Sequence, residues 1–223
     1  MAALYSSDLV PLFSQPSSSS TITSYLNALT SDSSIPEPEI KTYTDAIYHN
    51  YYSLGLSLCF DPSKGLESVD IYNPSPNPPP KRLNQKPSPV YSTPPGIVLN
   101  FTSDTITLPP KKEGEQPLNI PRSENFKLVK GKTGRDLVSH LGEPSRKGAG
   151  GWTGLWLEWS SVPLKASIPN GEKEVKIGIM VELRDPGANE LLTEEGRKKG
   201  MGGVWERASR WEWSNIKFFK VDQ

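Results

Sequence analysis

Alternating apolar and polar residues mark the clearest strands in this sequence. Leu56, Leu58 and Phe60 fall on one side of an extended run, with small or polar residues on the other side. Turn-forming residues at 61–65 separate this run from a second alternating run at 66–73, so the pattern predicts a β-hairpin. The same reasoning predicts further strands at 97–99, 105–108, 126–129, 154–159, 175–183 and 213–221.

Helical spacing of apolar residues is confined to short segments. Residues 133–141 have one apolar face, and Thr133 is placed to cap their first turn. A second short helix is expected over 23–29, with Thr21 or Thr23 as its cap. Short helices among many strands predict an α+β fold built on antiparallel sheets.

Stretches rich in serine or proline divide the chain. Residues 1–21 include a serine run and are expected to form a disordered tail, because such a segment buries too little surface to offset its ordering entropy. The nine prolines of residues 74–95 favour polyproline II, so we expect an exposed loop there. A further loop is expected at 163–173. Residues 22–221 then form a single α+β domain.

Two parts of this domain repeat one plan, a short helix, a loop with proline and then antiparallel strands. Residues 55–62 parallel residues 178–186 with one residue inserted, and a further strand follows each of them. The domain is therefore expected to contain two helix-plus-sheet units, 22–73 and 126–221, that pack together.

Composition excludes several classes of function. The chain has 25 basic and 25 acidic residues, so it lacks the basic surplus of a broad nucleic-acid surface. One cysteine and two histidines are too few for a disulfide framework or a zinc site, and no cofactor is expected. With neither a secretory signal nor an apolar run of about 18 residues, we expect a cytoplasmic protein without a transmembrane segment.

Catalytic motifs are weak in this sequence. Gly131-Lys132-Thr133 lacks the earlier glycine of a P-loop, because position 126 is phenylalanine, and it is interpreted as a turn before a helix. His140 is expected to be exposed or to cap a helix end. Glu158 and Glu182 lie on the polar side of two strands and, as neighbours, would form the carboxylate pair of a glycosidase.

All six tryptophans fall in the last 72 residues. Trp159 is expected in the core, whereas Trp152 and Trp156 share the opposite side of the strand with Glu158. An exposed tryptophan anchors a protein partner or stacks on a sugar, unless residues 204–213 cover it. Basic pairs beside the proline-rich loop would meet an acidic partner or anionic lipid. The candidate partner-binding residues are Trp152, Trp156, Glu158, Lys81 and Arg82.

One segment carries a family resemblance. Residues 45–61 read DAIYHNYYSLGLSLCFD and resemble the aromatic "NYF-LGVD-LFD" segment of the eukaryotic phagosome assembly factor family. The "LG-P" motif that ends a helix in that family is matched by residues 141–144, and strands like 178–183 and 215–219 follow in the same order. The resemblance covers roughly 45–220, the C-terminal half of a typical member. It implies a non-enzymatic adaptor that acts with a propeller-protein partner at forming autophagosomal membranes.

Three hypotheses of function remain open on the sequence. The first is a non-enzymatic cytosolic protein-interaction module or adaptor in autophagy or membrane trafficking, with a protein partner and peripheral membrane contact. The second is a small-ligand or carbohydrate-binding protein, with or without hydrolytic activity, that uses Trp152, Trp156, Glu158 and Glu182. The third is a structural subunit of a larger complex.

Overall fold

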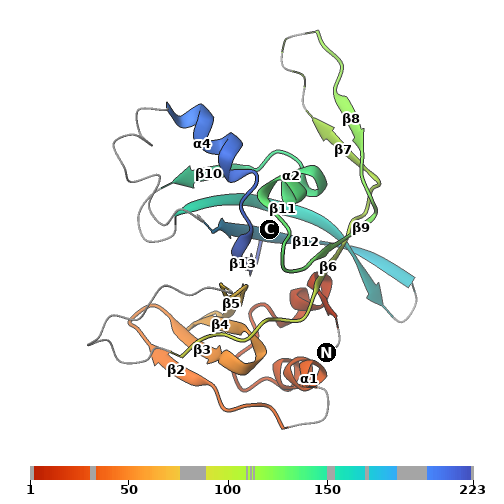
Figure 1. Cartoon of the computed structure of the whole chain (residues 1–223). Coiled ribbons are helices and arrows are strands. Elements are labelled where there is room, and N and C mark those ends of the chain that lie inside the picture. Colours follow the sequence, from red (N-terminus) through yellow and green to blue (C-terminus); the bar gives the residue numbers. More distant parts are fainter. Residues whose placement is uncertain are drawn as a thin grey trace.

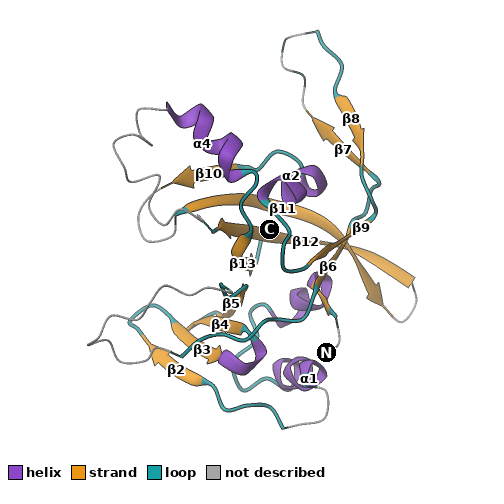
Figure 2. Ribbon diagram, viewed as in Figure 1, coloured by secondary structure: helices purple, strands orange, loops and turns teal. Residues whose placement is uncertain are grey.

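The computed structural model describes residues 3–30, 34–75, 89–108, 110, 112, 114–149, 154–168, 171–184 and 200–221. These residues form an α+β fold dominated by antiparallel sheets, as the sequence pattern predicts (Figures 1 and 2). The strands of the largest sheet are β2 (Glu39–Thr42), β3 (Ile47–Tyr51), β4 (Leu56–Asp61), β5 (Gly65–Tyr72), β10 (Arg146–Ala149), β11 (Leu155–Ile168), β12 (Gly171–Leu183) and β13 (Trp213–Phe219).

Smaller elements surround this sheet. A three-stranded sheet contains β1 (Leu4–Tyr5), β6 (Ile97–Asn100) and β9 (Asn125–Leu128), and a hairpin contains β7 (Thr105–Leu108) and β8 (Leu118–Pro121). The helices are α1 (Ser20–Leu29), α2 (Gly134–Leu141) and α4 (Gly200–Ala208), with 3₁₀ turns η1 (Ser6–Leu12) and η2 (Tyr52–Leu54). The β7–β8 hairpin extends away from the rest of the fold (Figure 1).

The large sheet consists of two four-stranded halves joined at their last strands. Its order is β10-β11-β12-β13-β5-β4-β3-β2, and every neighbouring pair is antiparallel. Strands β4 and β12 contain most of the two similar sequence stretches, 55–62 and 178–186. They occupy equivalent positions, because each directly flanks the central β5–β13 pair on its own side. The two expected units therefore contribute opposite halves of one continuous sheet.

One face of the sheet is apolar and forms the core. Leu56, Leu58 and Phe60 of the predicted hairpin are buried, and so are Ile216 and Phe218 of the last strand, which confirms both predictions. The 3₁₀ turn η1 contacts β11 and β12, and side chains from α1 and α2 join the same apolar cluster. Burying one face of a sheet under short helical elements is the arrangement that strict alternation of apolar residues favours.

The prediction of a disordered tail at residues 1–21 is wrong for residues 3–21. Leu4 pairs with Ile97 in a parallel bridge, and Leu9 and Leu12 are buried in the core. The serine run stands at the start of α1, where Ser19, rather than Thr21 or Thr23, is the N-cap, and its hydroxyl accepts a hydrogen bond from the backbone N–H of Thr21 at 3.2 Å. Serine is favoured at that position because its oxygen satisfies an unpaired helix N–H.

The prediction of a loop at 163–173 is also wrong over most of its length. Strand β11 continues through Pro163 to Ile168, and β12 begins at Gly171. Strand β10 pairs only with residues 155–158 of β11. Beyond them, β11 pairs with β12 on one side and, among the described residues, has on its other side only the isolated bridge between Leu164 and Phe101, so proline is tolerated at position 163. The register also shifts between Trp159 and Val162, just before the proline.

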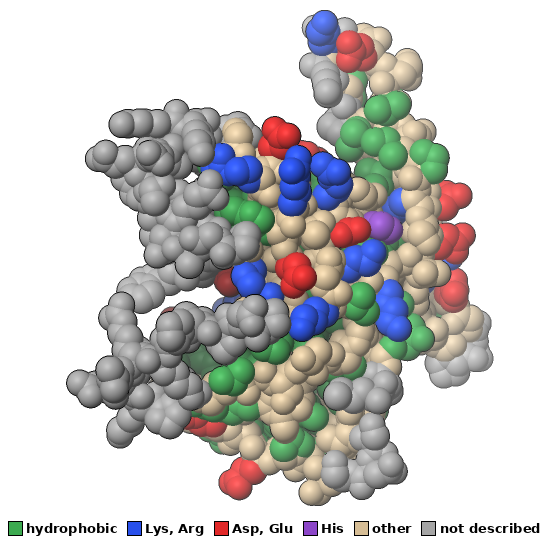
Figure 3. All heavy atoms as spheres, viewed as in Figure 1, with side chains coloured by type: hydrophobic (Ala, Val, Ile, Leu, Met, Phe, Trp, Pro, Cys, Tyr) green, Lys and Arg blue, Asp and Glu red, His purple; other side chains and the backbone are tan. Residues whose placement is uncertain are grey.

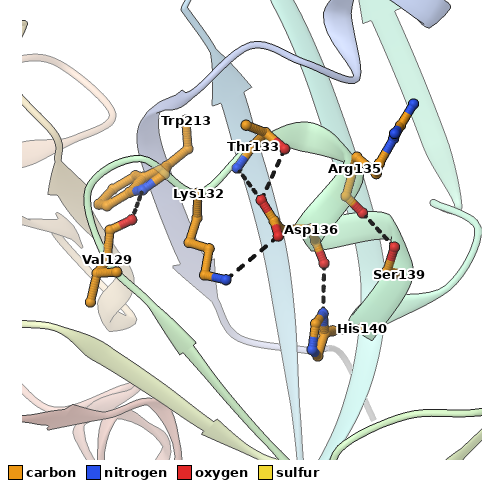
Figure 4. A network of polar contacts seen from close by, with 8 residues as sticks. All are labelled: Val129, Lys132, Thr133, Arg135, Asp136, Ser139, His140 and Trp213. Carbon is orange, nitrogen blue, oxygen red and sulfur yellow. Dashed lines mark hydrogen bonds and ion pairs between the residues drawn. The ribbon is translucent and has the colours of Figure 1, made fainter.

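Helix α2 begins with the cap that the sequence predicts (Figure 4). The backbone N–H and the hydroxyl of Thr133 both donate to Asp136 Oδ2, at 2.8 and 2.9 Å. At the other end of the helix, His140 Nδ1 lies 2.8 Å from the carbonyl oxygen of Asp136. Trp213 Nε1 donates to the carbonyl of Val129 at 3.0 Å and ties the segment before α2 to β13.

Candidate functional site

A single row of side chains crosses the large sheet on the face opposite the core. Residues that pair directly in antiparallel strands point to the same face. Following the pairs across all eight strands gives Arg146, Glu158, Met180, Lys217, Asp70, Ser57, Asn50 and Glu39. Apart from Met180, every residue of this row is charged or forms hydrogen bonds through its side chain, so this face differs from the apolar one.

The middle of this row is a buried polar cluster. Asp70 is 4% exposed, with Lys217 Nζ 3.7 Å and Asn215 Nδ2 3.5 Å from its Oδ1. Burial raises the pKa of Asp70, and the charge of Lys217 acts in the opposite direction. The pKa of Glu182 is also raised, first by burial and then by the negative charge of Asp70. The cluster thus holds two carboxyl groups close to one ammonium group.

Towards β2, the row ends in a hydrogen-bonded floor centred on Asn50. The hydroxyls of Ser57 and Tyr91 each donate to Asn50 Oδ1 at 2.8 Å. Asn50 Nδ2 donates to the backbone carbonyl of Glu39 at 3.1 Å. Because donors and acceptors on this buried side chain are paired, the floor holds a fixed arrangement of β2, β3 and β4.

Three tyrosine rings lie in contact above this floor. The ring of Tyr91 stacks on that of Tyr72, with centroids 3.8 Å apart at an interplanar angle of 13°, and meets that of Tyr52 at 4.7 Å and a tilt of 48°. The backbone N–H of Ser92 donates to the carbonyl of Tyr52 at 2.7 Å, which fixes the end of the proline-rich loop to the sheet. Residues 89–95 have no regular secondary structure, as expected for that loop, and its residues 76–88 lie outside the described part of the chain.

These tyrosines form one wall of an open cleft of about 640 Å³. Its lining, called the tyrosine cleft below, consists of Lys41, Tyr43, Asp45, Ala46, Tyr48, Asn50, Tyr52, Tyr72, Pro89 and Tyr91. Five of the eight tyrosines of the chain are in this lining. At the outer rim, Tyr43 is 57% exposed, and its ring meets that of Tyr48 edge to face with centroids 5.8 Å apart. The volume is typical of ligand-binding clefts, which span about 300–1,000 Å³.

Tyr48 and Tyr52 are neutral hydrogen-bonding groups at neutral pH. Burial raises the pKa of Tyr48 to about 12, and burial together with the hydrogen bond to Glu39 raises the pKa of Tyr52 to about 12. The Tyr52 hydroxyl donates to the carboxylate of Glu39, whose Oε2 also lies 3.3 Å from Lys41 Nζ. The second carboxylate at the cleft, Asp45, has no ion pair among the described residues. Among the described residues, Lys41, Asp45 and the adjacent Glu39 together therefore carry one net negative charge.

The tryptophan and glutamate candidates lie at the other end of the same sheet face. Trp156 pairs with Gly148 on one side and Glu182 on the other, and its half-buried ring covers Gly148, where a Cβ would lie 2.5 Å from the ring. Glu158 is 7% exposed and binds Arg146 through two hydrogen bonds, of 3.0 and 2.8 Å. The cluster around Asp70 separates the tyrosine cleft from this region.

The structure leaves some of the remaining site predictions untested and decides others. Trp152, Lys81 and Arg82 lie outside the described residues, so their role stays a prediction. Glu158 and Glu182 share a face, but Glu158 pairs with Met180, so they are not direct cross-strand partners. Trp159 is 4% exposed and donates from Nε1 to the carbonyl of Gly142 at 3.0 Å, which confirms its place in the core.

Sequence reasoning does not reveal the tyrosine cleft. Tyr43, Tyr48 and Tyr52 form a dense aromatic run, but locally this run indicates only a strand and the family resemblance. Tyr72 and Tyr91 follow at least 20 residues later, and only the sheet register and the proline-rich loop bring them to the same place. The high number of tyrosines over residues 43–91 is the one feature of the sequence that points to this site. It predicts an aromatic surface but not the shape of the cleft.

Other features of the described residues bear on the class of site. No group of three or more His, Cys, Asp and Glu side chains there is arranged to hold a metal ion. No helix in the same part of the chain is long and apolar enough to cross a bilayer. Over α2, Lys and Arg side chains are interspersed with Asp and Glu (Figure 3). Comparison with protein-family models, with characterised proteins and with solved structures finds no match to this chain.

Proposed function

We propose that the protein is a non-enzymatic protein-interaction module, an adaptor whose partner docks in the tyrosine cleft. The observation that carries the proposal is the convergence of five tyrosines on one open cleft above a hydrogen-bonded floor. Tyrosine presents a large, rigid, amphipathic surface and loses little conformational entropy on binding, which is why it is enriched at protein interfaces.

The charged groups of the cleft favour binding over catalysis. Lys41 and Glu39 are paired with each other, and Glu39 also accepts the hydroxyl hydrogen of Tyr52. A general base or nucleophile needs a pKa near the working pH, whereas the pKa values of Tyr48 and Tyr52 are raised to about 12. These groups are suited to orienting a bound chain by hydrogen bonds.

The resemblance to the phagosome assembly factor family points to the biological setting. It supports an adaptor in autophagy or membrane trafficking, acting in the cytosol with peripheral membrane contact. This part of the proposal rests on residues 45–61, which include Asp45, Tyr48, Asn50 and Tyr52 of the cleft lining.

The test is affinity purification of the tagged full chain from its own cells, with mass spectrometry. Tyr43→Ala is the diagnostic variant because Tyr43 is 57% exposed, so its removal leaves the core intact. Tyr5→Ala is the matched control, since Tyr5 is 43% exposed and lies in β1, outside the cleft. We expect a stoichiometric partner that is lost with Tyr43→Ala and retained with Tyr5→Ala.

Two other results would contradict this proposal. A partner retained by Tyr43→Ala but lost with Trp156→Ala would move the contact surface to the tryptophan side of the sheet. The absence of any stoichiometric partner in the wild-type purification would overturn the adaptor function itself.

A further inference from the structure

We propose that the segment bound by the tyrosine cleft is a proline-rich stretch of a partner protein, in polyproline II conformation, with an arginine or lysine beside its prolines. This inference rests on the proposed function and adds the chemistry of the partner. Three features of the described residues carry it, namely the geometry of the rings, the chain segment already seated on them and the charge of the lining.

The rings form the kind of surface that accepts proline side chains. The rings of Tyr43 and Tyr48 stand at 87° to each other, and the ring of Tyr52 contacts that of Tyr91 at a tilt of 48° in the same lining. Aromatic-lined grooves bind polyproline II segments because that helix is preformed and loses little entropy on docking. At about 3.1 Å per residue, six residues of polyproline II span about 19 Å, so a short segment suffices.

The end of the chain's own proline-rich loop already lies against these rings. Pro89 lines the cleft, Tyr91 stacks on Tyr72 and meets the ring of Tyr52 at a tilt, and the backbone N–H of Ser92 donates to the carbonyl of Tyr52. An irregular, proline-containing segment is thus held by ring stacking and a backbone hydrogen bond. The outer rim at Tyr43 and Tyr48 offers rings of the same kind to a second chain.

The charge at the cleft favours a basic residue next to the prolines of the bound segment. Lys41 and Glu39 compensate each other at 3.3 Å, so Asp45 supplies the remaining charge of the rim. A guanidinium or ammonium group near Asp45 would also lie close to the rings of Tyr43 and Tyr48, whose faces attract cations. An acidic peptide would meet an unfavourable field at the same place.

The experiment measures binding of fluorescein-labelled peptides to the purified full chain by fluorescence polarisation. The probe contains five prolines followed by an arginine. One comparison peptide replaces the prolines by alternating glycine and serine, and a second replaces the arginine by glutamate. We expect the glycine–serine peptide to bind at least about tenfold more weakly, since it lacks both the proline rings and the preformed helix. The glutamate peptide should bind about fivefold more weakly.

Variants of the protein assign the effect to the cleft. Tyr43→Ala should weaken binding of the arginine probe about tenfold, and Tyr5→Ala should leave it unchanged. Tyr43→Phe keeps the aromatic ring and removes only the hydroxyl, so it should retain most of the affinity. Asp45→Asn should remove the preference for arginine over glutamate while the preference for proline remains. Circular dichroism of each variant checks that the fold is retained.

The outcomes separate this inference from the proposed function. Equal binding of the proline and glycine–serine peptides, or unchanged probe binding to Tyr43→Ala, would overturn it. If a cellular partner still depends on Tyr43 in that case, the adaptor function stands and the cleft binds a different kind of chain. If the arginine probe also fails to displace that partner, the proline-rich segment is excluded as its contact.

Discussion

Lys217 and Asp70 lie directly opposite each other on β13 and β5, with Nζ 3.7 Å from Oδ1. These two strands are the only direct pairing between the four-stranded halves within the described sheet order, so the ion pair stands at their junction. Because Asp70 is 4% exposed, its charge depends on the ammonium group of Lys217 for compensation. The pair therefore couples the stability of the two halves.

The first prediction concerns loss of the ammonium group. Lys217→Met should lower the free energy of unfolding by about 2 kcal/mol, because it leaves a buried carboxylate uncompensated. The loss is smaller than for a fully buried pair, since the Lys217 side chain is 32% exposed. Denaturant unfolding measures it, with Lys41→Met as the control at a pair whose side chains are about half exposed. If the two substitutions lowered the free energy of unfolding equally, the Lys217–Asp70 pair would stabilise the protein no more than an exposed ion pair does.

The second prediction concerns pH. Because the pKa of Asp70 is raised in the folded protein, the folded state binds this proton more tightly than the unfolded chain does. Stability from this group is therefore gained as pH falls through its folded pKa and lost as pH rises through it. Between about pH 7 and pH 4, the wild type should gain stability relative to Asp70→Asn. Lys217, Asn215 and Glu182 face position 70 in both proteins. Because the charge of Asp70 also raises the pKa of Glu182, Asp70→Asn removes part of that shift, and this contribution to the difference has the same sign as that of Asp70 itself.

A pH-independent difference between the wild type and Asp70→Asn would contradict this prediction. Unfolding curves in urea at several pH values supply the measurement, because urea does not screen charge. Asp61→Asn is a useful comparison of opposite sign, since hydrogen bonds from Ser63 lower the pKa of Asp61. The stabilising contribution of Asp61 is lost as pH falls through its folded pKa.

Strands with strict alternation are predictable from local sequence, whereas the N-terminal segment is not. In β4 the apolar residues recur every second position, so local sequence alone defines a buried face. In η1, Leu9 and Leu12 are three residues apart, which is one turn of a 3₁₀ helix, but Asp8 and Pro11 interrupt the segment and it is too short for its period to predict a buried face. Their burial depends on β11 and β12, which follow more than 140 residues later.

The candidate site shows the same limit. Tyr43, Tyr48 and Tyr52 are close in sequence, but Tyr72 joins them through the pairing of β4 with β5. Tyr91 joins through the path of the proline-rich loop, which no local pattern defines. Composition predicts that aromatic side chains anchor a partner, but it does not say which ones. It favours the tryptophans over the tyrosines as candidates, because the tryptophans are concentrated at one end of the chain.

The third prediction tests the N-terminal segment as part of the core. Leu9→Ala should lower the free energy of unfolding by about 3 kcal/mol, because Leu9 is fully buried and its truncation leaves a cavity. Tyr5→Ala, four residues earlier and 43% exposed, should change it by less than about 1 kcal/mol. Thermal and denaturant unfolding measure both variants. A Leu9→Ala protein as stable as the wild type would restore the interpretation of this segment as a tail.

The fourth prediction concerns Gly178 of β12 and Phe219 of β13, which pair directly. The ring of Phe219 covers Gly178 so closely that a Cβ added there would lie 2.1 Å from Cε2. Gly178→Ala should therefore cost about 2 kcal/mol of stability, because the ring must leave its position over the strand. An aromatic ring over a cross-strand glycine is a known means of fixing register.

A double-mutant cycle separates this contact from an intrinsic effect of alanine. In the Phe219→Ala background, Gly178→Ala should cost nothing or stabilise slightly, because alanine loses less backbone entropy than glycine in a strand. The two single substitutions should thus couple by about 1–2 kcal/mol in denaturant unfolding. Additive effects would mean that the ring does not constrain position 178. Strong coupling would show that this pair helps to fix the β12–β13 register, and with it the positions of Lys217 and Asn215 beside Asp70.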